Sequence, residues 1–190
     1  MRIWLPSFIE SYLDDNYGSK KGFLKYYYHK VLQILGFYNK YSIDNLDFIP
    51  NRYVFVCAGN ICRSPLAEVV AKNAGVNSIS FGLDTRGGDP ADPRAIEFAS
   101  SVQLDLTKHN TTKASKYIPE KGDVIVAMEP KHIAMYHLTA VDVPIVLLGM
   151  SNNNKKPFIH DPYCTNDVFF KKVEALVVEF TKILVRYGKS

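Results

Sequence analysis

The sequence predicts an α/β fold with a parallel sheet. Residues 53–56 and 123–127 are short, almost wholly apolar segments, as strands buried on both faces are. Longer segments with apolar residues at helical spacing separate the predicted strands. Strands that alternate with helices in this way form a parallel sheet with right-handed crossovers. Ligands of such sheets bind beyond the carboxyl ends of the strands.

The first half of this pattern begins after residue 51. The strand over 53–56 is followed by a helix over 65–74, in which Leu66, Val69 and Val70 share one face and Gly75 serves as the C-terminal cap. A short strand over 78–81 comes next. A helix from 93 to about 102 opens with Asp92 as N-cap and a proline at its first position.

The second half repeats the alternation. We expect a strand over 123–127, a helix from about 129 to 137, a strand over 144–148 and a long helix over 168–185. The last helix is amphipathic, with its apolar residues on one side. The first predicted strand ends at Cys57, so this residue should lie at the ligand-binding edge of the sheet.

Composition narrows the class of protein. The chain has 190 residues, of which 47% are hydrophobic, enough for one core with an appendage. No apolar run approaches the roughly 20 residues needed to span a bilayer, and the first residues are unlike a secretory signal. Three cysteines without regular spacing indicate a reducing, cytoplasmic compartment rather than a disulfide framework. A net charge of +4 is too small and dispersed to indicate nucleic-acid binding.

The most informative segment is residues 54–65, VFVCAGNICRSP. A strand that feeds a tight loop and then a helix aims backbone N–H groups and the positive helix end at one point, which suits an anion. Arg63 adds a planar fork that fits two oxygens of a phosphate. A cysteine at the base of such a cradle should ionise readily, so Cys57 is a candidate nucleophile aimed at a bound oxyanion.

Other residues of this segment agree with that geometry. Gly59 allows close backbone approach, Asn60 can tie the loop together, and Ser64 offers a hydroxyl to the thiolate. The full set that we expect to bind phosphate or support the loop comprises Ala58, Gly59, Asn60, Ile61, Cys62 and Ser64. The alternative is that Cys57 is an inert buried cysteine at the end of a strand.

Cys57 to Pro65, taken with the later Asp161-Pro162-Tyr163, resembles the low-molecular-weight protein tyrosine phosphatase family. The resemblance runs from about Arg52 to Tyr187. It implies a four-stranded parallel sheet flanked by helices, Rossmann-like, the phosphotyrosine phosphatase I fold. It also implies hydrolysis of phosphotyrosine through a phosphocysteine intermediate, without metal or cofactor. In bacteria, members of this family resemble enzymes that oppose the tyrosine kinases of polysaccharide export. The resemblance therefore implies such a kinase as a candidate substrate.

Asp161 is the predicted general acid. A phenolate is a poor leaving group, so an acid opposite the cradle must protonate it and later activate water. Three Asp-Pro dipeptides occur, and most such pairs only start turns or helices. Asp161-Pro162 alone follows the last strand, precedes an aromatic residue and matches the family motif.

The resemblance also assigns supporting residues. Ser80, Asn60 and His109 are similar to a family network that stiffens the loop, although His109 can equally be an ordinary surface histidine. Tyr163 is placed to form one wall of a phosphotyrosine slot. The family often has an aromatic residue on the other wall, between residues 84 and 90, but this chain offers only Arg86 there. Ile61 favours phosphotyrosine, because a relative that acts on phosphoarginine tends to carry threonine.

Two other classes of function remain open. The chemistry of an arsenate reductase on the same scaffold resembles a relay through additional cysteines. In this chain only Cys164 follows the loop. A phosphotyrosine-binding module without turnover would be expected to lack Cys57, Arg63 or Asp161. Cys62 suggests redox sensitivity, since a disulfide with Cys57 would protect the nucleophile from over-oxidation. No metal site is expected, because the two loop cysteines lack paired ligands.

The sequence predicts an N-terminal extension over residues 1–50 and the catalytic domain over residues 51–190. Residues 23–36 carry apolar positions at helical spacing with lysines nearby, which predicts a helical extension. We favour a helical appendage packed on the catalytic domain. The alternative is a basic, aromatic surface for a membrane or a protein partner.

Overall fold

The computed structural model describes residues 6–137, 139, 142–151 and 155–187. Its centre is a sheet of four parallel strands in the order β2-β1-β3-β4. The strands are β1 (Arg52–Cys57), β2 (Ser78–Gly82), β3 (Asp123–Ala127) and β4 (Ile145–Leu147). Every residue of β1 and β3 is buried: the apolar residues as their composition predicts, and the charged Arg52 and Asp123 as an ion pair. The predicted parallel α/β fold is therefore confirmed.

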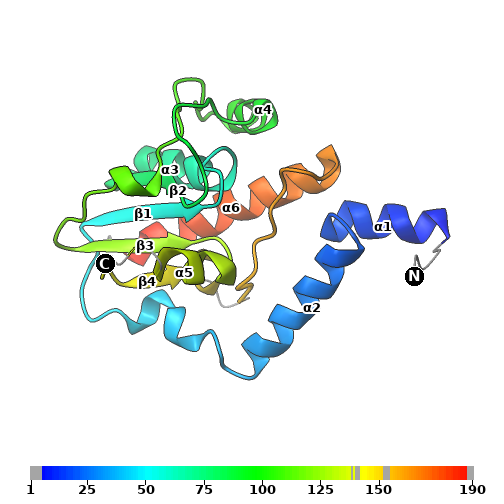
Figure 1. Cartoon of the computed structure of the whole chain (residues 1–190), viewed down its shortest axis with the longest axis horizontal. Coiled ribbons are helices and arrows are strands. Elements are labelled where there is room, and N and C mark those ends of the chain that lie inside the picture. Colours follow the sequence, from blue (N-terminus) through cyan, green and yellow to red (C-terminus); the bar gives the residue numbers. More distant parts are fainter. Residues whose placement is uncertain (1–5, 138, 140–141, 152–154, 188–190) are drawn as a thin grey trace.

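Helices cover both faces of this sheet (Figure 1). Residues of α3 (Arg63–Asn73), α4 (Pro93–Ser101) and α6 (Asp167–Tyr187) share one hydrophobic cluster with Tyr53 and Phe55 of β1. On the other face, α5 (Pro130–His137) packs against the alternate residues Val54 and Val56. The two-residue repeat of a strand thus divides β1 between two cores.

The predicted element boundaries hold to within about two residues. The helix after the loop begins two residues earlier than expected, at Arg63 rather than at Pro65. Cys62 is its N-cap residue, so Pro65 is the third helical residue. A proline is still tolerated there, because the first N–H groups of a helix have no intrahelical acceptor.

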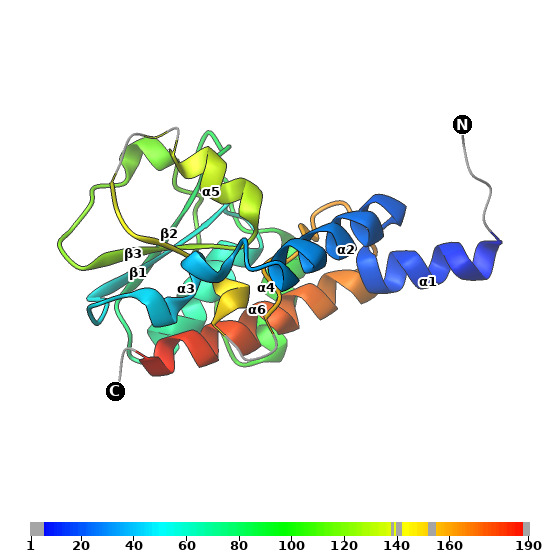
Figure 2. The same ribbon diagram turned by 90° about the horizontal axis from the view of Figure 1, so that it is seen from below.

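The N-terminal extension is helical, as predicted. It contains α1 (Ser7–Tyr17) and α2 (Lys20–Ile34), followed by the short 3₁₀ turns η1 (Asn39–Tyr41) and η2 (Ile43–Asn45). The two helices project beyond the α/β body, next to one end of α6 (Figures 1 and 2). Further 3₁₀ turns are η3 (Ala114–Lys116) and η4 (Leu148–Met150). No helix in the described part of the chain is long and apolar enough to span a bilayer.

Candidate active site

The loop between β1 and α3 is shaped by Asn60. Its backbone lies in the left-handed region, with φ at 59°, which asparagine tolerates better than most residues. Its side-chain nitrogen donates to the hydroxyl of Ser64 at 2.9 Å and to that of Ser80 at 2.8 Å. Asn60 therefore links the loop to α3 and to the neighbouring strand β2.

Two further contacts hold Asn60 from outside the loop. The His109 ring nitrogen Nε2 lies 2.8 Å from the backbone carbonyl of Asn60, and the Thr112 N–H donates to the Asn60 side-chain oxygen at 2.9 Å. The structure thus brings both Ser80 and His109 into contact with Asn60. Thr112 escaped sequence analysis because it acts through its main chain, which any residue could supply.

Cys57 lies at the carboxyl end of β1, at the base of the loop. Its Sγ atom is 3.0 Å from the Ser64 hydroxyl and accepts from the Asn60 N–H at 3.2 Å. The sulfur therefore lies against a backbone donor of the loop and next to the N-terminus of α3. Cys57 is only 3% exposed, so its sulfur does not lie on the open surface.

Arg63 is fully buried next to the loop. One of its terminal nitrogens, Nη1, donates to a Glu129 carboxylate oxygen and to the Ile159 carbonyl, each at 2.9 Å. The other, Nη2, lies 3.0 Å from a carboxylate oxygen of Asp161. Its buried Nε–H has no partner among the described residues and remains a donor for an oxyanion. Burial alone would lower the pKa of Arg63, but Asp161 and Glu129 outweigh it and raise that pKa.

Asp161 lies on the segment between η4 and α6, with its carboxylate partly exposed. The contact with Arg63 places the predicted general acid directly beside the predicted phosphate-binding group. His160 precedes it and bonds through Nδ1 to the backbone carbonyl of Asp161 at 2.8 Å, not to the carboxylate. Burial lowers the pKa of His160, so this imidazole is held in its neutral form.

Arg94 anchors the segment that follows Asp161. Its guanidinium donates to the carbonyls of Thr165 at 2.9 Å and Tyr163 at 2.6 Å, while it stacks 4.2 Å from the Phe170 ring centre. From the sequence, Arg94 is expected only to lie at the start of a helix. The role was missed because its partners are backbone carbonyls about 70 residues away in the chain.

The N-terminal extension anchors the same segment from the opposite side. Asn166 donates to the Asp15 carboxylate at 2.8 Å, and His29 stacks on Phe158 at 4.8 Å. Gly22 of α2 sits so close to His160 that an added Cβ would lie 2.7 Å from the imidazole nitrogen Nε2. The acid-bearing segment is thus held between α4 and α2.

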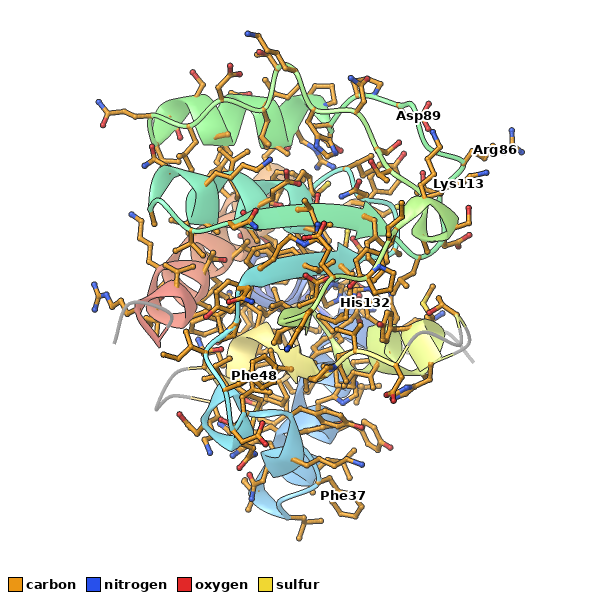
Figure 3. The ribbon with its side chains drawn as sticks, turned by 90° about the vertical axis from the view of Figure 1, so that its left-hand side faces the viewer. Phe37, Phe48, Arg86, Asp89, Lys113 and His132 are labelled. Atoms are coloured by element: carbon orange, nitrogen blue, oxygen red, sulfur yellow. The ribbon has the colours of Figure 1, made fainter. Side chains whose placement is uncertain are left out.

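Three buried titratable residues near Arg63 were also missed. Glu129, the partner of Arg63, directly follows the residue after β3, and its place at the carboxyl end of a strand was a usable signal. His132 lies 3.5 Å from the Glu129 carboxylate, and burial lowers its pKa to about 2 (Figure 3). Glu174 of α6 is completely buried, neither carboxylate oxygen has a partner among the described residues, and burial raises its pKa to about 8.

The predicted substrate walls are solvent-exposed. Tyr163 is 55% exposed and follows Asp161 by two residues. Arg86 is exposed and points outward, near Asp89 and Lys113, at the edge of the molecule (Figure 3). Close backbone approach is required at Gly82 rather than at Gly59, since a Cβ on Gly82 would meet the Ala58 carbonyl at 2.8 Å. At Gly59 the same atom would make an ordinary contact, 3.4 Å from the Ile61 side chain.

The remaining loop residues pack tightly. Cys62 is buried, and burial, reinforced by Glu174 and Asp92, raises the pKa of its thiol. The carbonyl of Ile61 accepts from the Asp92 N–H at 2.8 Å, and that of Ala58 accepts from Asp84 at 2.9 Å. Cys57, Cys62 and Cys164 are all free thiols. Among the described residues, no three His, Cys, Asp or Glu side chains gather in a way that could hold a metal ion.

Comparison with known proteins finds relatives of this chain in sequence and in structure. Residues 52–187 match the family model described as low molecular weight phosphotyrosine protein phosphatase. The phosphatase Wzb of Salmonella typhi is 33% identical over 131 residues, which cover 67% of this chain and 87% of Wzb. The crystal structure of the tyrosine phosphatase AmsI from Erwinia amylovora superimposes with a TM-score of 0.67 at 30% identity, covering 75% of this chain and 97% of AmsI. Vibrio vulnificus Wzb in complex with benzylphosphonate gives a TM-score of 0.60 at 28% identity, over 72% of this chain and 97% of the other.

Proposed function

Because the chain belongs to the low molecular weight protein tyrosine phosphatases, we propose that Cys57, Arg63 and Asp161 carry out the hydrolysis of phosphotyrosine by this enzyme. The family consists of cysteine-dependent hydrolases that act through a phosphocysteine intermediate. One observation carries the assignment. The loop that surrounds the Cys57 sulfur leads directly into Arg63, and the Arg63 guanidinium lies 3.0 Å from the Asp161 carboxylate.

In the first step, the Cys57 thiolate attacks phosphorus and the bond to the tyrosyl oxygen breaks. The loop N–H groups and the Arg63 guanidinium bind the non-bridging oxygens, whose negative charge is held in the transition state. Asp161 donates its proton to the departing phenolate, so that neutral tyrosine leaves. The sulfur now carries the phosphoryl group.

In the second step, water attacks the phosphocysteine. Asp161, now a carboxylate, accepts a proton from this water, and inorganic phosphate leaves. The sulfur departs as a thiolate, which the Ser64 hydroxyl, 3.0 Å away, stabilises by hydrogen bonding. The cycle restores each group without a metal or a cofactor.

Loop rigidity is the contribution of Asn60, Ser80 and His109. If the loop had to become ordered around each substrate, part of the substrate's binding energy would be lost to that ordering. In a preformed loop the binding energy stabilises the transition state instead. The contacts of Asn60 with both hydroxyls and with His109 support this role.

The substrate is a phosphotyrosine-containing protein. We propose that Tyr163 forms one wall of the slot for the phosphotyrosine ring and that the exposed Arg86 contacts acidic residues flanking it. We further propose a tyrosine kinase of polysaccharide export as the physiological substrate, on the family resemblance. We also propose a cytoplasmic location, since the three free thiols suit the reducing conditions of that compartment.

The proposal is tested by p-nitrophenyl phosphate hydrolysis with wild type, Cys57→Ser and Asp161→Ala. Cys57→Ser should abolish turnover, and Asp161→Ala should lower kcat by about 10²–10⁴-fold, the range for a general acid. The matched control is Asp89→Ala, which removes the aspartate of another Asp-Pro pair and should leave kcat unchanged. Equal rates in all four proteins would contradict the assigned roles.

A further inference from the structure

The outward face of α2 carries an unusually exposed apolar stripe. Leu24, Tyr28, Val31 and Leu35 recur at intervals of four, three and four residues, which places them on one side of the helix. Tyr27 and Ile34 extend this side. All six are between 43% and 70% exposed, whereas α3, α4, α5 and α6 turn apolar residues into the two hydrophobic clusters. We call these six residues the α2 stripe.

The opposite face of α2 is bound to the body of the protein. Gly22 is buried against His160, and His29 stacks on Phe158 and bonds to the Tyr38 hydroxyl at 2.6 Å. These contacts orient the helix, so the stripe is directed away from the catalytic domain. The sequence favours a helical appendage packed on the catalytic domain. One face of α2 does contact that domain, but its larger apolar face remains outside.

Basic residues accompany the stripe. Residues 19–43 contain Lys20, Lys21, Lys25, Lys30 and Lys40 but no aspartate or glutamate, a formal charge of +5. The whole chain carries +4, so all the other residues together carry −1. In helical projection Lys25 flanks one side of the stripe and Lys30 the other. All five lysines are exposed.

We propose that the α2 stripe docks the enzyme on the surface of an anionic lipid membrane. Leucine and valine along the centre, tyrosines and an isoleucine beside them, and Lys25 and Lys30 at the margins match the composition of helices that lie in a membrane interface. Tyrosine rings favour the depth of the lipid head groups, and lysines are attracted to anionic ones. A second copy of this chain is the weaker candidate occupant, because pairing the stripes would bring two segments of charge +5 together.

Docking through the α2 stripe would leave the catalytic mechanism unchanged but would decide where it acts. The inner face of α2 contacts the segment that holds Asp161, so a docked stripe would place the catalytic loop close to the lipid surface. Phosphotyrosines on membrane-associated proteins would then be presented at high local concentration.

Vesicle co-sedimentation of the full-length protein tests this proposal. The vesicles are phosphatidylcholine alone or phosphatidylcholine mixed with phosphatidylglycerol. Wild type should pellet with the mixed vesicles, less with the neutral ones, and less at high salt. The variant Val31→Ser/Leu35→Ser should reduce the bound fraction by about tenfold or more. The matched control Val102→Ser/Ile118→Ser removes two exposed apolar residues elsewhere and should bind as wild type does.

Hydrolysis of p-nitrophenyl phosphate in solution should be the same in all three proteins, which verifies that the variants fold. The proposal is overturned if wild type stays in the supernatant with mixed vesicles, or if the stripe variant pellets as wild type does. A dimer in sedimentation velocity that the stripe variant loses, without vesicle binding by wild type, would assign the stripe to a second copy and also overturn it.

Discussion

Glu174 is a carboxyl group that the fold buries without any hydrogen-bond partner among the described residues. Burial raises its pKa to about 8, and the nearby Arg63 only partly opposes this. The neutral form is therefore the one that the folded state accepts near neutral pH. The Arg63 guanidinium is directed toward Glu129 and Asp161 instead.

We predict that Glu174→Gln stabilises the protein at pH 7 and above. The folded pKa of Glu174 lies above the ordinary value near 4.5, so the folded state holds a proton that the unfolded state has released between pH 4.5 and 8. The free energy of unfolding of wild type should therefore fall as pH rises through this window, by about 3 kcal/mol at pH 7. Glutamine should remove this part of the pH dependence. Denaturant unfolding at pH 5 and pH 7 measures it, and parallel pH profiles for the two proteins would contradict the prediction.

Cys62 is buried in the same loop as Cys57, and we predict that it makes peroxide inactivation reversible. Mild oxidation of Cys57 should lead to a disulfide between the two sulfurs, which a thiol reductant then breaks. The raised pKa of Cys62 makes its thiol a slow partner near neutral pH, so recovery should improve at higher pH. Cys62→Ser should instead lose activity irreversibly. The exposed Cys164 provides the control Cys164→Ser, and peptide mass mapping that finds sulfinic Cys57 with free Cys62 in wild type would refute the disulfide.

At the scale of elements, the acid-bearing segment depends on helices from two parts of the molecule. Residues after Asp161 form no helix or strand until α6 begins at Asp167, so their position comes from outside contacts. Arg94 of α4 binds two carbonyls of this segment, and α1 and α2 contact it through Asp15 and Gly22. A general acid displaced by 1 Å loses much of its effect, which makes these supports relevant to rate.

We expect Arg94→Met to lower kcat for p-nitrophenyl phosphate by about tenfold. Methionine keeps contact with Phe170 but cannot donate to the Tyr163 and Thr165 carbonyls. The loss should be smaller for an aryl phosphate with a more acidic phenol, which needs less help from Asp161. Lys171→Met, a change on the exposed side of α6, is the control. An equal loss for both substrates would show that Arg94 acts through something other than the acid.

For the whole molecule, the extension is joined to the catalytic body most firmly at its last residues. Tyr38 is buried in the cluster that includes α5, and Ile43 in the cluster on the opposite face of the sheet. The exposed stripe of α2 lies outside both clusters. The segment 37–50 therefore contributes to the core, although the predicted domain boundary assigns it to the extension.

Truncation separates these two parts. A chain without residues 1–36 should keep most of its thermal stability, whereas one without residues 1–50 should lose roughly a further 3–5 kcal/mol, because it lacks two large buried side chains. Thermal unfolding of the two proteins and the full chain measures the difference. Equal melting temperatures for both truncated chains would place the boundary at residue 51, as the sequence predicts.

Much of this architecture follows from local sequence. The two central strands are recognisable because runs such as residues 124–127 are apolar at every position, as expected of a strand covered on both faces. The cradle is equally local. Cys57, Asn60, Arg63 and Ser64 lie within eight residues, so the turn that brings them together is encoded where they occur.

By itself the sequence determined the parallel α/β fold, the anion cradle and the family, because each depends on residues adjacent in the chain. Only the tertiary structure decided that Glu129, Arg94 and Glu174 surround the site and that the α2 stripe remains exposed. Those contacts join residues many positions apart, and packing of whole elements sets them. A helical repeat specifies that one face is apolar, but which face meets the protein and which meets its surroundings is settled only when the elements assemble.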